Sequence, residues 1–106
     1  MPKFLVKADY TAEGLRGLQK DKASGRRAAV ASAIEAVGGK LEAFYVSLGG
    51  HDVVTIVDLP STQAAVTLSV TRSATGLVRI KTTALLSVEE ADQALAKSIT
   101  YKAPGR

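Results

Sequence analysis

The chain's only histidine stands beside an aspartate in the stretch LGGHDVV, residues 48–54. Imidazole titrates near neutral pH, so His51 is a candidate general acid or base at the mouth of a cavity. Neighbours on a strand point to opposite faces, so His51 and Asp52 do not pair, and a Ser-His-Asp relay is not indicated. The simpler interpretation makes His51 a polar residue beside a turn and Asp52 a hydrogen-bond acceptor for the hairpin.

Two arginines follow a predicted helix start in the stretch SGRR, residues 24–27. Free backbone amides and guanidinium groups can hold an anion together, which makes Arg27 a candidate ligand-binding residue. The simpler interpretation is a capped helix whose arginines face solvent or pair with Glu35 or Asp21. The glycines at 25 and at 49–50 match neither the Walker nor the dinucleotide-binding spacing.

A further polar group shares one face of the predicted sheet and comprises Lys7, Asp9, Tyr45, Arg79, Lys81 and Thr83. Its cations and tyrosine could line a pocket for an acidic or phenolic ligand, with Tyr45 and Lys81 as candidates. The alternative is a set of interface salt bridges and edge lysines that prevent strand-to-strand aggregation. Tyr10 points to the other face, where it marks a cavity between sheet and helices or belongs to the core.

The composition limits the chemistry further. The chain has no cysteine, which excludes disulfides, thiolate nucleophiles and zinc–thiolate sites. One histidine and scattered aspartates give no metal-ligand spacing, so neither a metal nor a cofactor is predicted. The net charge of +4 arises within residues 1–27, and it is too dispersed, with too few aromatic residues, for nucleic-acid binding. No apolar run approaches the length of about 18 residues that a membrane-spanning helix needs. No signal peptide is recognisable either, so we expect a cytoplasmic protein without membrane contact.

The hydrophobic pattern predicts one domain over residues 1–100 and a flexible tail over 101–106. A short helical turn is expected around Leu15 and Leu18, and Ser24 is expected to cap the helix that follows. Glycines 49–50 predict a two-residue hairpin turn, and Ser87 with Glu90 predicts a capping box. The remaining elements are strands over 3–10, 40–48, 52–59 and 77–85, helices over about 24–37 and 61–74, and a last helix with the stripe Val88, Ala91, Leu95 and Ile99.

The order of these elements predicts an α+β, ferredoxin-like βαββαβ fold with a four-stranded antiparallel sheet and a C-terminal helix. The first and third strands are largely apolar on both faces and belong in the centre. Parity places Asp52, Val54 and Ile56 toward the helices. The opposite face is expected to carry His51 and an apolar set of Leu5, Leu41, Tyr45, Val53 and Val57. A second copy is the simplest cover for that face, so a homodimer, or a larger even oligomer, with the dimeric α+β barrel architecture is predicted.

Three stretches, MPKFLVKADYTAEG, GGKLEAFYVSLGGHDVVTIVDLP and VRIKTTALLSVEEADQAL, resemble the GYD-domain family, which is named for a Gly-Tyr-Asp triplet. The similarity covers about nine-tenths of the chain in matching order. The triplet here is Gly50-His51-Asp52, so histidine replaces the tyrosine. The resemblance implies a ferredoxin-like fold related to dimeric α+β barrels, and it implies no activity.

Three functions remain open at this point. The first is a binding module for a small organic or anionic ligand, with Tyr10, Arg27, Tyr45, His51, Asp52 and Lys81 as candidate residues. The second is a cofactor-independent oxygenase or isomerase with His51 or Tyr10 as acid–base group, by analogy of fold alone. The third is a structural or interaction module without a pocket. A cavity of useful size separates the first two from the third.

Overall fold

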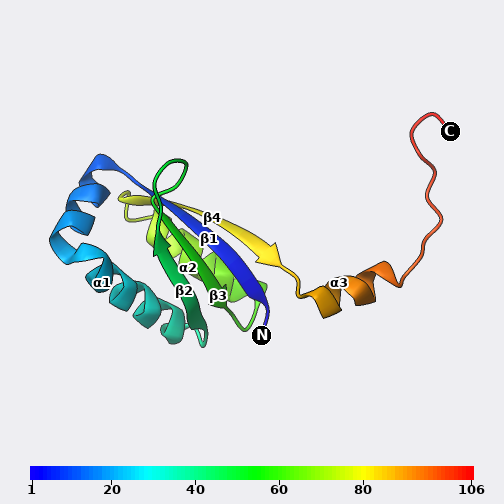
Figure 1. Cartoon of the computed structure of the whole chain (residues 1–106), viewed down its shortest axis with the longest axis horizontal. Helices are drawn as coiled ribbons and strands as arrows, with labels where there is room; N and C mark the ends of the chain where they lie inside the picture. Colours follow the sequence, from blue (N-terminus) through cyan, green and yellow to red (C-terminus); the bar gives the residue numbers. More distant parts are fainter.

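The four strands of the computed structural model, which describes all residues 1–106, form one antiparallel sheet in the order β2-β3-β1-β4. The strands are β1 (Lys3–Tyr10), β2 (Lys40–Val46), β3 (Val53–Asp58) and β4 (Val78–Leu85). The prediction that the first and third strands are central and the others are edges is confirmed. The connectivity is that of a ferredoxin-like α+β fold, with helices between β1 and β2 and between β3 and β4 (Figure 1).

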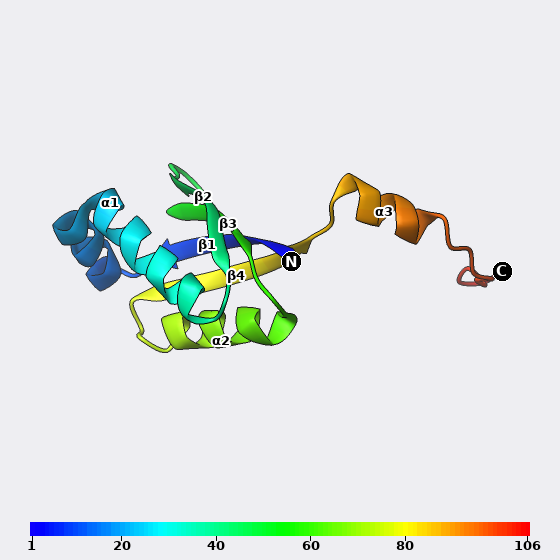
Figure 2. The same ribbon diagram turned by 90° about the horizontal axis from the view of Figure 1, so that it is seen from below.

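Two helices, α1 (Ala12–Ala36) and α2 (Thr62–Ser73), pack on one face of the sheet and leave the other open (Figure 2). Side-chain oxygens of Thr11 and Ser61 cap them by accepting hydrogen bonds from the third residue beyond. The core between the layers consists of Phe4, Val6, Val30, Ile34, Val57, Leu59, Ala64 and Ala65. Gly39 permits this packing, because a Cβ there would lie 2.5 Å from the Asp58 carbonyl oxygen.

The prediction of which β3 side chains face the helices is wrong. Val53 and Val57 are 1% exposed and face the helices, whereas Val54 and Ile56 lie on the open face. Both sets are apolar, so alternation alone does not orient this strand. The register decides it, because Val57 pairs with Phe4 of the core.

The β2 strand is irregular, which also corrects a predicted orientation. A bulge at Glu42 shifts the register between Leu41 and Ala43. The bulge breaks the alternation, so Leu41 packs against the core while Tyr45 lies on the open face. The apolar part of the open face therefore consists of Leu5, Ala43, Tyr45, Val54 and Ile56.

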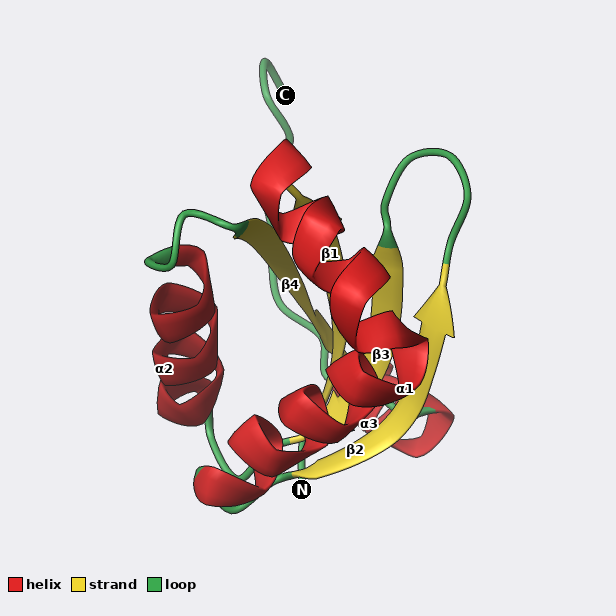
Figure 3. Ribbon diagram, turned by 90° about the vertical axis from the view of Figure 1, so that its left-hand side faces the viewer, coloured by secondary structure: helices red, strands yellow, loops and turns green.

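The connection between β2 and β3 is longer than the two-residue turn predicted from Gly49 and Gly50. It forms a wide loop that extends beyond the sheet (Figure 3), closed by a 2.8 Å hydrogen bond from the Ser47 amide to the Asp52 carbonyl oxygen. Of these two glycines, only Gly49 has a positive φ, of 111°. A type I′ turn needs positive φ at both central residues, so this pair does not form one.

The last helix, α3 (Val88–Leu95), stands apart from the sheet and the other helices (Figures 1 and 2). The predicted capping box between Ser87 and Glu90 is present, but the helix ends before Ile99. The protruding segment raises the radius of gyration to 16.9 Å, against about 13 Å for a compact chain of this length. None of the helices is both long and apolar enough to cross a bilayer.

Candidate functional site

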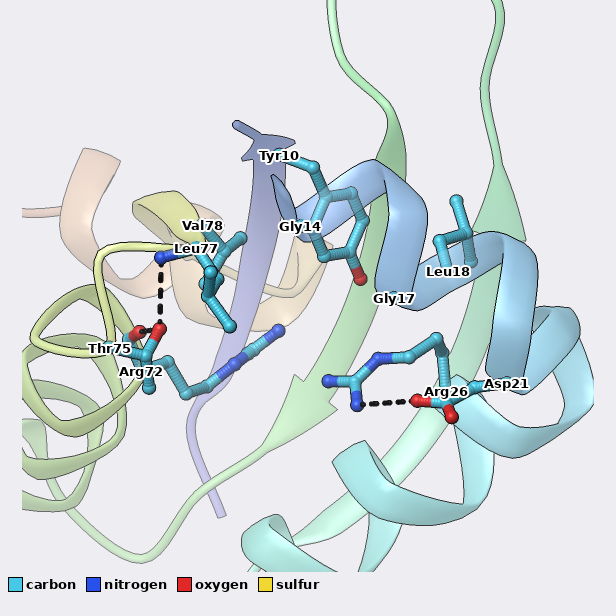
Figure 4. A pocket seen from close by; sticks show the side chains of 10 residues that line it. All are labelled: Tyr10, Gly14, Gly17, Leu18, Asp21, Arg26, Arg72, Thr75, Leu77 and Val78. Atoms are coloured by element: carbon cyan, nitrogen blue, oxygen red, sulfur yellow. Dashed lines mark hydrogen bonds and ion pairs between the residues drawn. The ribbon is translucent and has the colours of Figure 1, made fainter. Parts of the chain in front are cut away.

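A cavity of about 240 Å³ opens between the sheet and the helices, where β1 ends and β4 begins (Figure 4). Its walls come from four elements that are distant in sequence: the end of β1, the first half of α1, the last turn of α2 and the start of β4. The lining residues are Tyr10, Gly14, Gly17, Leu18, Asp21, Arg26, Arg72, Thr75, Leu77 and Val78. Ligand pockets commonly measure about 300–1,000 Å³, so this one suits a small ligand.

Two arginines from different helices converge on this cavity. Arg26 of α1 and Arg72 of α2 point toward one another across it, and the hydroxyl of Tyr10 lies above the space between them (Figure 4). Arg72 forms no ion pair, although it is half-buried. Burial lowers the pKa of Arg72 below its ordinary value; nearby Tyr10 opposes this shift, and the Arg26 cation adds to it. The charged form of Arg72 is therefore held at a cost.

Arg26 is only partly satisfied. One terminal nitrogen lies 3.5 Å from the Asp21 carboxylate, but its Nε is buried without a hydrogen-bond partner. An unpaired buried N–H group is unfavourable, and such groups are rare in native proteins. The two guanidinium groups therefore line one small cavity with few partners of their own, and an anion is the group that they would hold.

A break in α1 lies beside this cavity. Lys22 interrupts the helix with φ 65° and ψ 170°, a conformation that is normally restricted to glycine and costs of order 1–3 kcal/mol. Before the break, Gly17, Leu18 and Asp21 line the cavity; after it, Val30 packs in the core. The predicted change from a short turn to a second helix near Ser24 lies at Lys22, where two helical segments that together form α1 meet at a kink.

A close approach between α1 and β4 forms the floor of the cavity. The buried Gly14 is so near β4 that a Cβ atom would lie 2.0 Å from the Leu77 carbonyl oxygen. That oxygen accepts hydrogen bonds from the Thr11 amide, at 3.0 Å, and from the Thr11 hydroxyl, at 3.2 Å. These hydrogen bonds hold the first turn of α1 against the residue that precedes β4. Only glycine fits at position 14, because any side chain would meet the Leu77 carbonyl oxygen.

Among the residues proposed from the sequence, Tyr10 alone lines this cavity. Arg26 belonged to the SGRR stretch, but the arginine proposed there was Arg27, which is exposed. Arg72 was missed entirely, because a single arginine near the end of an apolar helix carries no motif. A half-buried position for Arg72 was the one available signal, since α2 faces the sheet at positions 64, 65 and 68 and Arg72 follows at helical spacing.

His51 and Asp52 lie near the same end of the sheet but outside the cavity. The Asp52 carboxylate accepts a 2.8 Å hydrogen bond from the Tyr10 amide, so it ties the loop to β1 instead of closing its own hairpin. The Asp52 amide donates to the Ala8 carbonyl oxygen at 3.0 Å. His51 Nδ1 lies 3.1 Å from a carboxylate oxygen of Asp9 on the open face. Residues 51 and 52 precede β3, so strand alternation does not assign their side chains to a face of the sheet.

The other proposed residues are spread over the surface. Arg27 and Tyr45 line a shallow groove of about 280 Å³ between α1 and the end of β2. Lys81 lies on the open face of β4, directly opposite Lys7 of β1. Tyr45 and Lys81 share that face but occupy its two opposite edge strands, so the structure does not bring them into one pocket. No group of three or more His, Asp or Glu side chains is arranged to hold a metal ion.

Comparison with known proteins gives one match. A family model described as the GYD domain matches residues 4–95, which is most of the chain. The match includes the triplet Gly50-His51-Asp52 and all four strands, apart from Lys3, the first residue of β1. No curated protein and no solved structure matches the sequence.

Proposed function

The chain belongs to the GYD-domain family, and we propose that it is a binding module whose cavity takes a small organic anion. The observation that carries this proposal is the convergence of Arg26 and Arg72 on one cavity with donors that no residue of the chain satisfies. A planar carboxylate matches a guanidinium group through two parallel hydrogen bonds. Tyr10 and Leu18 supply apolar surface for the body of the ligand.

Benzoate and benzamide provide a matched pair of probes, because they share shape but differ in charge. A ligand of this size is expected to bind with a Kd of about 1 mM. Benzoate should raise the melting temperature and shift the NMR signals of residues around Tyr10 and Leu18, whereas benzamide should not. Arg72→Met should abolish the effect, and Arg16→Met, at an exposed position of α1 that does not line the cavity, should preserve it. Equal responses to both probes, or to neither, would contradict the proposal.

A scaffold without a pocket is less well supported, because the cavity has a useful size and carries unused donors. An acid–base role is restricted by the same geometry. Tyr10 reaches the cavity, whereas His51 contacts Asp9 on the open face. Of the two acid–base candidates, only Tyr10 is therefore placed to act on a ligand held there.

We also propose that the protein is a homodimer through the open face of its sheet. Leu5, Val54 and Ile56 stand at the centre of this face, where no helix of the chain covers them. A continuous apolar surface of this kind is typical of an interface. Sedimentation should show a dimer, Ile56→Asp should dissociate it, and Thr67→Asp on the exposed side of α2 should leave it intact. A monomeric wild type would refute the dimer without bearing on the cavity. The predicted cytoplasmic location stays a prediction.

A further inference from the structure

The segment from Leu86 to Tyr101, here called the arm, presents apolar side chains to solvent. Leu86, Val88, Leu95, Ile99 and Tyr101 are 65%, 74%, 80%, 85% and 73% exposed. Within α3, Val88, Ala91 and Leu95 recur at helical spacing and form one stripe. Three acidic residues, Glu89, Glu90 and Asp92, accompany this stripe, and the helix has no basic residue. The arm thus carries a short acidic amphipathic helix, followed by Lys97, and this helix has no partner in its own chain.

The open face of the sheet carries the opposite charge. Lys7 and Lys81 lie directly opposite each other on β1 and β4, an unfavourable like-charge pair, and neither has an acidic partner. Among the other charges of this face, Lys3 pairs with Asp58 at 2.8 Å and His51 contacts Asp9, whereas Arg79 of β4 forms no ion pair. Lys7 and Lys81, which have no acidic partner, therefore border the apolar centre formed by Leu5, Val54 and Ile56.

We infer that the arm of each copy docks on the open sheet face of a second copy, with its acidic side toward Lys7 and Lys81. This inference rests on the proposed homodimer and specifies how it is held together. A dimer of bare sheets would place Lys7 and Lys81 of both copies in one interface, since a two-fold interface uses the same patch on both sides. The arm supplies both the apolar cover and the missing negative charge.

Cross-linking between differently labelled copies tests this arrangement, because the chain has no native cysteine to interfere. One full-length variant carries Leu95→Cys in the arm, and a second, isotope-labelled variant carries Ile56→Cys on the open face. A short bifunctional maleimide should join the two kinds of chain. The matched control replaces Ile56→Cys with Thr67→Cys on the exposed side of α2, and it should give at least tenfold less product.

The outcomes separate the arm from the dimer itself. A dimer in sedimentation that gives no Leu95–Ile56 product would overturn the arm exchange and leave the homodimer standing. A dimer that cross-links equally well to the α2 control would overturn the docking site. A monomer would overturn both proposals, while benzoate binding would remain a separate question.

Charge exchange gives a second readout that does not depend on cross-linking. Asp92→Lys or Lys81→Glu alone should raise the dimer Kd by about tenfold, because a homodimer contains each contact twice. The double variant Asp92→Lys/Lys81→Glu should return most of the affinity. Failure of this rescue, with both single variants folded, would contradict the proposed charge contact.

Discussion

Replacement of Arg72 by methionine should make the unliganded protein more stable. Arg72 is half-buried, has no acid partner and faces Arg26 across the cavity, so its charge is a cost in the empty state. Methionine keeps an unbranched apolar stem of similar length, so packing beside Leu68 and Ile80 is largely retained. Relief of an unpaired, partly desolvated cation is worth about 0.5–1.5 kcal/mol. For a domain of this size that corresponds to a rise in Tm of about 3–8 °C.

Urea unfolding of wild type, Arg72→Met and the surface control Arg16→Met measures this effect directly. At ten times its Kd, benzoate should stabilise the wild type by about 1.4 kcal/mol and the Arg72→Met variant not at all. A more stable Arg72→Met variant that no longer responds to benzoate would show that Arg72 binds the ligand and lowers the stability of the unliganded protein. Destabilisation of Arg72→Met by more than about 1 kcal/mol would refute the reasoning, because it would show that Arg72 supports the fold.

Four further outcomes follow from the same structure. Gly14→Ala should destabilise the protein by about 1–3 kcal/mol in urea unfolding, because its Cβ would meet the Leu77 carbonyl oxygen. Lys22→Gly should stabilise it by about 1 kcal/mol in the same assay, because glycine adopts the observed conformation without strain. Asp52→Ala should cost about 1–2 kcal/mol by leaving the Tyr10 amide without an acceptor, with Asp52→Asn nearer to wild type. Hydrogen bonds from the Ser87 amide and hydroxyl lower the pKa of Glu90 below its ordinary value. Because that folded-state pKa is depressed, the stability that this contact gives α3 is present above the unfolded-state pKa and is lost as pH falls through the folded one. NMR titration of Glu90 should show the low midpoint, and Ser87→Ala should raise it part of the way.

The sequence was sufficient for the elements and their order because those depend on local pattern and on strand polarity. The bounds of β1, the capping box at Ser87 and the central position of β1 and β3 all agree with the structure. The orientation of β3 was not recoverable in this way, because both of its faces are apolar. A bulge at Glu42 likewise has no signature in a strand whose residues alternate almost regularly.

The cavity was harder to predict than the fold because its parts are distant in sequence and carry no shared motif. Tyr10 was identified from its parity on β1, which is a short-range property. Arg26 and Arg72 become neighbours only through the packing of two helices on one sheet face. Each arginine taken alone has the ordinary interpretation of an exposed cation. Their significance comes from the pairing of like charges in a partly buried space, which an unliganded fold has no structural reason to retain. For this reason the unused donors of Arg26 and Arg72, and not the histidine of the family triplet, are the first place to look for a ligand.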